Sequence, residues 1–63
     1  MDWVIGDKVI VMHEKYDIEA GTFGEVCNID GDKIWIRTFN DDGSPAGAYP
    51  FDSDDLQFYH WKN

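Results

Sequence analysis

Short apolar runs alternate with clusters of Gly, Asp, Asn and Pro along the whole chain. The runs are rich in Val, Ile, Trp, Phe and Tyr, and no window keeps apolar residues at helical spacings of three and four. Half-buried strands give such a pattern, whereas an amphipathic helix repeats every 3.6 residues. The sequence therefore predicts an all-β fold.

The apolar runs predict five strands, over residues 8–12, 22–29, 33–39, 49–51 and 56–60. The turn signal Asp30-Gly31-Asp32 joins the second and third runs into a hairpin. Residues 13–21 and 40–47 are expected to be loops, and residues 52–55 a single turn. The short run at 49–51 contains Pro50, which favours the edge of a sheet, because proline cannot donate a ladder hydrogen bond.

Alternation within the strands predicts which side chains face the core. In the third run, Ile34, Ile36 and Thr38 share one face, while Trp35 and its alternating neighbours share the other. Gly24 is expected at a bulge or at a close approach of two backbones. The predicted core consists of Val9, Val11, Val26, Ile34, Ile36, Leu56 and Phe58.

The length of 63 residues allows one domain, over residues 1–63, and leaves little room for a deep active-site cleft. The single cysteine, Cys27, cannot form an internal disulfide, and no Cys/His cluster has zinc spacing. An apolar fraction of 43%, with 16% aromatic residues, is too high for a disordered acidic tail. We therefore expect a domain that folds by packing alone.

Acidic residues outnumber basic ones by 13 to 5, which gives a formal charge of −8. Phosphate neutralisation needs Lys and Arg, so direct binding to nucleic acid or to an anionic membrane is not expected. No apolar run approaches the length of a transmembrane helix, and the N-terminus has no basic segment followed by a long apolar one. These features predict a cytoplasmic protein.

Two segments resemble known small domains. The first joins residues 6–11, Gly-Asp-Lys-Val-Ile-Val, with residues 21–26, Gly-Thr-Phe-Gly-Glu-Val, and resembles the KOW-type motif of ribosomal and transcription-elongation proteins. The second, residues 49–56, is similar to the proline, short turn and Asp-Leu before the last strand of bacterial and phage SH3-like domains. The resemblance implies a small five-stranded antiparallel SH3-like barrel, in an accessory protein of a bacterium or phage.

RNA-binding KOW domains carry basic residues in their loops, whereas the loops here are acidic. The resemblance therefore implies contact with protein rather than with RNA. The acidic loop residues are Glu14, Asp17, Glu19, Asp30, Asp32, Asp41 and Asp42.

A partner-binding patch is expected from exposed aromatics and from residues 40–55, which hold five carboxylates and no cation. The aromatics have a second interpretation, in which they cover the open end of the barrel, with Trp3 and Trp61 as structural lids. The carboxylates also have a second interpretation, in which they form a solvated surface that keeps the protein soluble. The predicted partner-binding residues are Trp35, Phe39, Asp41, Asp42, Tyr49, Phe51, Asp54 and Asp55.

No metal site, cofactor or catalytic residue is expected. The groups Asp30-x-Asp32 and Asp52-x-Asp54-Asp55 lack the spacing of a calcium loop with its terminal Glu. His13, His60 and Cys27 have no oxyanion loop or orienting group beside them in the sequence.

The predicted function is a non-catalytic acidic protein-interaction module that binds a protein with a basic surface and modulates a host enzyme. It is expected to be a monomer or a weak homo-oligomer. One alternative is a nucleic-acid mimic that blocks a DNA- or RNA-binding protein by charge. Another is a KOW-like domain associated with the ribosome or RNA polymerase.

Overall fold

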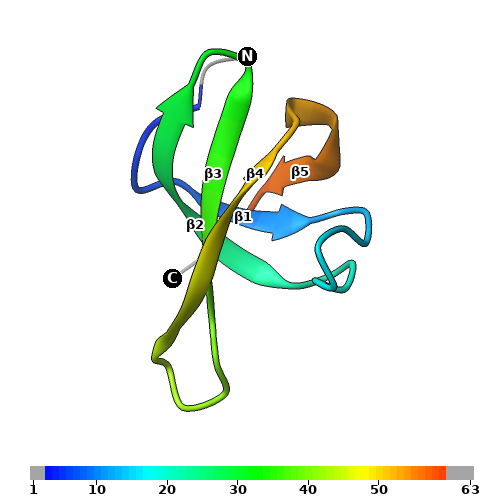
Figure 1. The fold of residues 1–63 in the computed structure, drawn as a ribbon, viewed down its shortest axis with the longest axis vertical. Coiled ribbons are helices and arrows are strands. Elements are labelled where there is room, and N and C mark those ends of the chain that lie inside the picture. Colours follow the sequence, from blue (N-terminus) through cyan, green and yellow to red (C-terminus); the bar gives the residue numbers. More distant parts are fainter. Residues whose placement is uncertain (1–2, 60–63) are drawn as a thin grey trace.

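The computed structural model describes residues 3–59, which form one antiparallel sheet of five strands (Figure 1). In chain order the strands are β1 (Lys8–Val11), β2 (Phe23–Asp30), β3 (Lys33–Phe39), β4 (Pro45–Phe51) and β5 (Leu56–Phe58). A 3-10 helix, η1 (Ser53–Asp55), connects β4 to β5. The spatial order is β4-β3-β2-β1-β5, which places β4 and β5 at the two edges. The prediction of an all-β fold is confirmed.

The strand bounds agree with the prediction to within one residue, except that β4 begins earlier and β5 ends earlier than expected. The third predicted strand, 33–39, has the observed bounds, and the predicted turn at 52–55 contains η1. β4 begins at Pro45 rather than Tyr49, because Pro45 pairs with Phe39 and Ala48 pairs with Arg37. The β3–β4 loop is therefore only residues 40–44, and the expected loop over 40–47 was too long.

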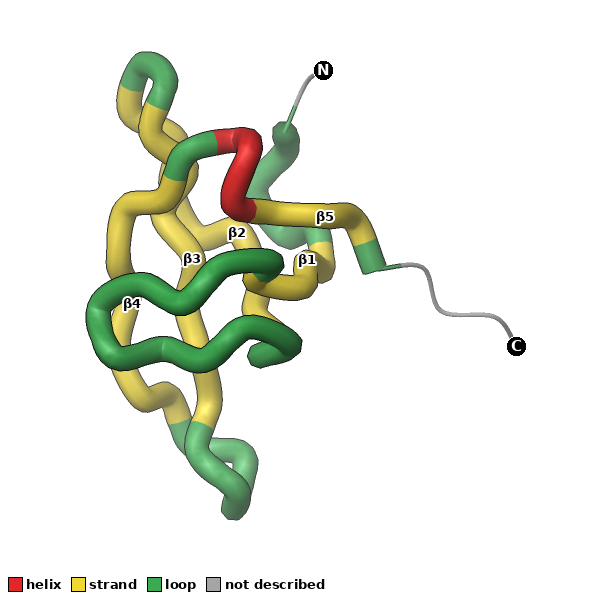
Figure 2. Tube along the Cα trace, turned by 90° about the vertical axis from the view of Figure 1, so that its right-hand side faces the viewer, coloured by secondary structure: helices red, strands yellow, loops and turns green. Residues whose placement is uncertain are grey.

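The sheet is open, which differs from the predicted barrel. Within the described residues no ladder joins β4 to β5. The three residues of β5 all pair with β1, and the 3-10 helix η1 connects β5 to β4 in place of a ladder. The first loop, residues 12–22, lies across the sheet and reaches β4 instead (Figure 2).

The core contains six of the seven predicted residues. Phe58 lies on an edge strand and is only half-buried. Its ring packs against Trp3, with ring centroids 4.3 Å apart. The seventh core residue is instead Phe51, which is fully buried. Trp3 also packs against the core, which confirms it as a structural lid; Trp61 lies outside the described residues. The core residues are Val9, Val11, Val26, Ile34, Ile36, Phe51 and Leu56.

Gly24 lies where two strands approach closely, as predicted, but the bulge is elsewhere. A Cβ atom at Gly24 would overlap the Cγ2 atom of Ile36 and lie 2.9 Å from the carbonyl oxygen of Arg37. The register shifts between Val26 and Asn28, so Cys27 is the extra residue of the bulge. This extra residue changes the phase of β2 and places Ile29, rather than Asn28, opposite Ile34.

The tip of the first loop is a small hairpin turn. Lys15 and Ile18 exchange backbone hydrogen bonds of 3.1 and 2.8 Å across it. Tyr16 and Asp17 between them have φ values of 56° and 64°, the left-handed conformation that both central residues of a type I′ turn adopt. The Tyr16 ring contacts the rings of Tyr49 and Phe51, at centroid distances of 5.4 and 5.5 Å. The first loop therefore closes the core over β4.

Candidate protein-interaction surface

Exposed aromatic side chains gather on the outer face of the sheet, which is the face opposite the core. Ile10 pairs with Phe23 across β1 and β2, while the adjacent pair, Val9 with Gly24, belongs to the inner face. Gly24 pairs in turn with Thr38, so Phe39, which follows Thr38, lies on the outer face of the next strand. The exposed fractions of Phe23 and Phe39 are 57% and 43%. Two large aromatic side chains thus remain in contact with water.

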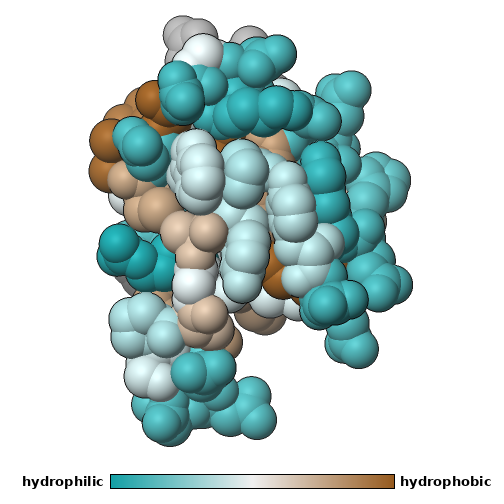
Figure 3. Space-filling model, in the orientation of Figure 1, coloured by the Kyte–Doolittle hydropathy of each residue, from teal (hydrophilic) through white to brown (hydrophobic). Residues whose placement is uncertain are grey.

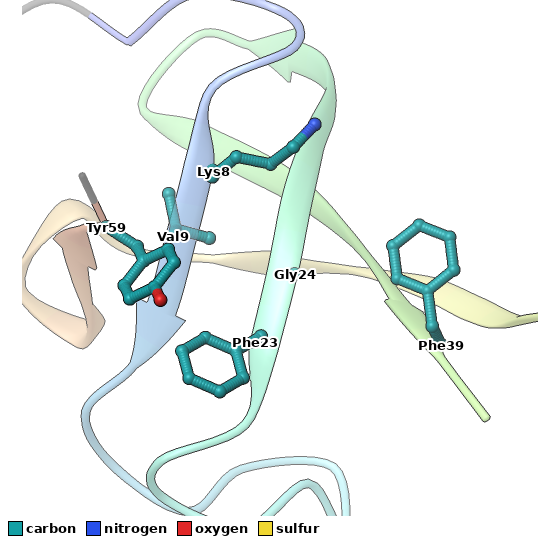
Figure 4. Close-up of a pocket in the computed structure, with 6 residues that line it drawn as sticks. All are labelled: Lys8, Val9, Phe23, Gly24, Phe39 and Tyr59. Carbon is teal, nitrogen blue, oxygen red and sulfur yellow. The ribbon is translucent and has the colours of Figure 1, made fainter. Parts of the chain in front are cut away.

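These aromatics line an apolar groove of about 340 Å³. Its walls are the side chains of Lys8, Phe23, Phe39 and Tyr59. Its floor is backbone, because the Val9 side chain is in the core and Gly24 has none. Figure 4 shows the Phe23 and Tyr59 rings close together and the Phe39 ring on the other side of Gly24. The centroids of the Phe23 and Tyr59 rings are 4.9 Å apart.

A row of charged side chains borders the groove on the outer face. Lys8 pairs with Glu25 across β1 and β2, and Glu25 pairs with Arg37 across β2 and β3. The Lys8 ammonium donates a hydrogen bond of 2.7 Å to the Glu25 carboxylate. Arg37 is exposed and forms no ion pair with any carboxylate in residues 3–59. The row therefore carries one unpaired positive charge.

Two carboxylates lie at the tip of the β3–β4 loop, directly after Phe39. The Asp42 carboxylate accepts hydrogen bonds from the amide and the hydroxyl of Ser44, at 2.9 and 2.6 Å. The Ser44 hydroxyl and amide lower the pKa of Asp42 below its usual value. Asp41 is exposed and forms no ion pair within the described chain. The β3–β4 loop that carries both side chains forms the hydrophilic region at the bottom of Figure 3.

A second group of carboxylates lies at the other end of β4, where it contacts two lysines. Lys33 approaches Asp52 to 2.5 Å, and Lys15 approaches Asp55 to 3.1 Å and Asp52 to 3.6 Å. The hydrogen bond and charge of Lys33 lower the pKa of Asp52. Asp54 is exposed and forms no such pair with the described residues. The expectation that residues 40–55 have uncompensated carboxylates is thus wrong for Asp52 and Asp55.

The predicted partner-binding residues do not form one patch. Trp35 and Phe39 lie on the outer face, although Trp35 is half-buried. Tyr49 and Phe51 pair with Ile36 and Ile34, so they face inward. Asp41 and Asp42 are separated from Asp54 and Asp55 by β4, whose seven residues span roughly 20 Å.

Phe51 lies at the sheet edge, as expected, but it cannot offer apolar area to a partner. Its exposed fraction is 0%, and the Tyr16 ring covers it. The expectation that Phe51 is accessible is therefore wrong, since the first loop folds over this end of β4. Tyr49 remains 37% exposed beside Tyr16.

Phe23 is the groove residue that the sequence interpretation missed. The strand alternation could have identified it. Gly24 and Val26 face inward, so Phe23, one position before Gly24, faces outward. An exposed aromatic next to a glycine on a central strand is a signal for a surface groove. Tyr59 also lines the groove.

Within residues 3–59, no group of three His, Cys, Asp or Glu side chains is placed to hold a metal ion. The Cys27 thiol is half-buried and donates a hydrogen bond of 3.5 Å to the Trp35 carbonyl oxygen. His60, which was weighed as a possible base, lies outside the described residues.

Comparisons with known proteins leave the function open. The chain matches no protein-family model, no curated protein and no solved structure. Across residues 3–59, no helix is long and apolar enough to cross a membrane. The function must therefore be inferred from the geometry of the chain itself.

Proposed function

We propose that this protein is a non-catalytic acidic protein-interaction module that binds its partner through the outer-face groove. The observation that carries the proposal is the exposure of Phe23 and Phe39 on neighbouring strands, at two walls of one apolar groove. Burying an aromatic side chain of this size stabilises a fold by about 1.5–3 kcal/mol. A domain this small forgoes part of that stabilisation at two positions that line the same groove, which favours a binding role for them.

The charge of the chain supports a partner with a basic surface. A net charge of −8 creates a long-range field that attracts positively charged proteins and speeds their association. The carboxylates of the β3–β4 loop lie next to the groove, so steering would bring such a partner to the apolar site. The side chains that line the groove include no nucleophile beside a general base, which supports a role without catalysis.

The resemblance to SH3-like and KOW-like domains indicates the setting in which this module acts. It supports a cytoplasmic accessory protein of a bacterium or phage, which binds and modulates a host enzyme. The ribosome and RNA polymerase are candidate partners on the same ground.

A nucleic-acid mimic is the second candidate function. The specific observation in its favour is that unpaired carboxylates project from loops at both ends of β4. A mimic would bind through these carboxylates and would not need the groove. The two functions therefore differ in which variants abolish binding.

Affinity capture from a bacterial lysate, followed by mass spectrometry, tests the proposal. Wild-type protein is compared with Phe39→Ser and with the control Met12→Ala, because Met12 has the same exposed fraction, 43%, but lies in the first loop. We expect a basic protein that is retained by wild type and by Met12→Ala but lost with Phe39→Ser. Melting curves check that each variant is folded.

The salt dependence of the captured complex separates the two functions. Binding through carboxylates alone should weaken steeply between about 50 and 500 mM salt, since screening shortens the range of charge interactions. Binding anchored by Phe23 and Phe39 should persist. Equal retention by wild type and folded Phe39→Ser at every salt concentration would rule out the groove as the binding site.

A further inference from the structure

The unpaired negative charge of residues 40–55 is concentrated beside one wall of the groove. Phe39 is the last residue of β3, and Asp41 and Asp42 follow it within three positions. The Cα atoms of Phe39 and Asp41 are therefore at most about 7 Å apart. At the other end of β4, Asp52 and Asp55 are paired with lysines.

Hydrogen bonds within residues 40–44 close the acidic tip into one turn. The Asn40 amide donates to the Ser44 carbonyl oxygen at 2.8 Å, and the Gly43 amide donates to the Asn40 carbonyl oxygen at 2.9 Å. The Asn40 side-chain amide also donates to the Ser44 hydroxyl at 3.0 Å. The carboxylates are thus presented on a closed turn directly beyond Phe39. An apolar site and a negative site lie within reach of one short peptide.

We propose that the groove binds an extended segment of the partner protein, with a large apolar side chain between Phe23 and Phe39 and a Lys or Arg one to three residues away. This inference rests on the proposed function and specifies the partner that the groove fits. An extended chain advances about 3.3 Å per residue, so a basic residue at that spacing reaches Asp41 and Asp42. The groove volume of about 340 Å³ is sufficient for one or two apolar side chains.

Single-stranded nucleic acid is the rival occupant, because aromatic rings can stack on bases. Lys8 and Arg37 beside the groove could meet phosphates, but Lys8 is already paired with Glu25. One unpaired guanidinium gives little phosphate affinity on a chain of charge −8. Charge complementarity therefore favours the basic peptide.

Selection from a phage library of random peptides of about 12 residues tests the inference. The full 63-residue chain is immobilised, and enriched peptides are synthesised with a fluorescent label. We expect an enriched pattern of one aromatic or large aliphatic residue followed or preceded within three positions by Lys or Arg. Amide chemical shifts should change at Phe23, Gly24 and Phe39 when such a peptide binds.

Matched variants show whether the two parts of the site act as proposed. Phe39→Ser should weaken the peptide about tenfold or more, as loss of a central aromatic contact does. Asp41→Asn should weaken it about two- to fivefold at low salt, whereas Asp54→Asn, an equal change of charge at an exposed site beyond β4, should change it less than twofold. The Met12→Ala control should leave the affinity unchanged.

Several results would overturn the inference. They are an enriched pattern without basic residues, equal effects of Asp41→Asn and Asp54→Asn, shift changes away from the groove, or tighter binding of single-stranded RNA than of the best peptide. If lysate capture still depends on Phe39 while the peptide pattern is not basic, the proposed function stands and the peptide class is wrong. If neither binding depends on Phe39, both fail.

Discussion

The Tyr16 hydroxyl donates a hydrogen bond of 2.6 Å to the carbonyl oxygen of Pro50. Pro50 pairs with Trp35 on an edge strand, where its backbone has no N–H to donate. The contact therefore satisfies an edge carbonyl group and fixes the first loop against β4. It also leaves less of this edge open to pairing with another chain, which is a general hazard of edge strands.

Tyr16→Phe should lower the free energy of unfolding by about 0.5–1 kcal/mol, because it removes one hydrogen bond at a half-exposed site and keeps the ring. Tyr16→Ala should cost more, since it also removes the contacts with Tyr49 and Phe51. Urea denaturation of both variants measures the difference. Tyr49→Phe is the control, because this variant also keeps its ring and Tyr49 does not donate the hydrogen bond to Pro50. Equal losses of stability for the two Phe variants would contradict this role of Tyr16.

Ile36→Ala and Phe51→Ala should both destabilise the fold strongly, because both side chains are fully buried. The expected costs are about 2–5 kcal/mol for Ile36→Ala and about 3–5 kcal/mol for Phe51→Ala. Arg37→Ala, one position along β3 on the outer face, should cost less than about 0.5 kcal/mol. A loss below about half a kilocalorie for Ile36→Ala would mean that the phase of β3 is reversed.

Much of the sheet could be predicted, because alternation is a local signal. The phase of β3 follows directly from Ile34, Ile36 and Thr38, which are all buried. Phe51 was assigned to the surface because its predicted strand of three residues was too short to show a phase. Its orientation follows from pairing with Ile34, which depends on the bulge between Thr38 and Phe39 in the β3–β4 ladder.

The candidate site was predictable only in part, because it depends on contacts between distant segments. Phe39 and its acidic neighbours were identified, since they are adjacent in the sequence. The pairing of Lys15 with Asp55 joins residues 40 positions apart, and no local pattern signals it. The expected charge of residues 40–55 was therefore right for Asp41 and Asp42 and wrong for the η1 carboxylates.

Gly24→Ala should destabilise the protein by about 1–3 kcal/mol, as overpacking does in a tight core. The added methyl group would press on the Ile36 side chain and on the Arg37 carbonyl oxygen, and the latter is backbone that cannot rotate away. Thermal denaturation measures the loss. A variant as stable as wild type would show that β2 and β3 can separate at this point, and that Gly24 is needed only for the groove floor.

Stability should fall in acid through Asp52. The hydrogen bond and charge of Lys33 lower the pKa of Asp52 in the folded protein below its usual value of 3.8. A carboxylate with a lowered folded pKa stabilises the fold above its unfolded pKa, and this contribution is lost as the pH falls through that value and then through the folded one. The urea midpoint should therefore decrease below about pH 4. Asp52→Asn should flatten this decrease, and Asp42, whose pKa is also lowered, contributes with the same sign.

Stability should also fall in base through the two lysines. The hydrogen bond to Asp55 raises the pKa of Lys15, and that to Asp52 raises the pKa of Lys33, above the usual 10.5. Their contribution is complete below the unfolded pKa and is lost as the pH rises through the raised folded values. Lys33→Gln should reduce the alkaline decrease of the urea midpoint. High salt should reduce it in wild type, since Lys33 is exposed and Lys15 is only half-buried, so both ion pairs are screened. An unchanged profile in the variant would remove Lys33 as a cause.

Direct nucleic-acid binding should be absent or very weak near physiological salt. The chain has five basic residues, and three of them, Lys8, Lys15 and Lys33, are held in ion pairs with carboxylates. Neutralising a phosphate would require breaking these pairs while the remaining carboxylates repel the backbone, so counterion release can supply little affinity. Mobility shift and fluorescence anisotropy with duplex DNA and single-stranded RNA, at about 150 mM salt, provide the measurement. Micromolar affinity for either would assign the Phe23–Phe39 groove to base stacking, and it would restore an RNA-binding role of the KOW type. We expect no binding of either nucleic acid in these assays, together with retention of a basic protein in the lysate capture.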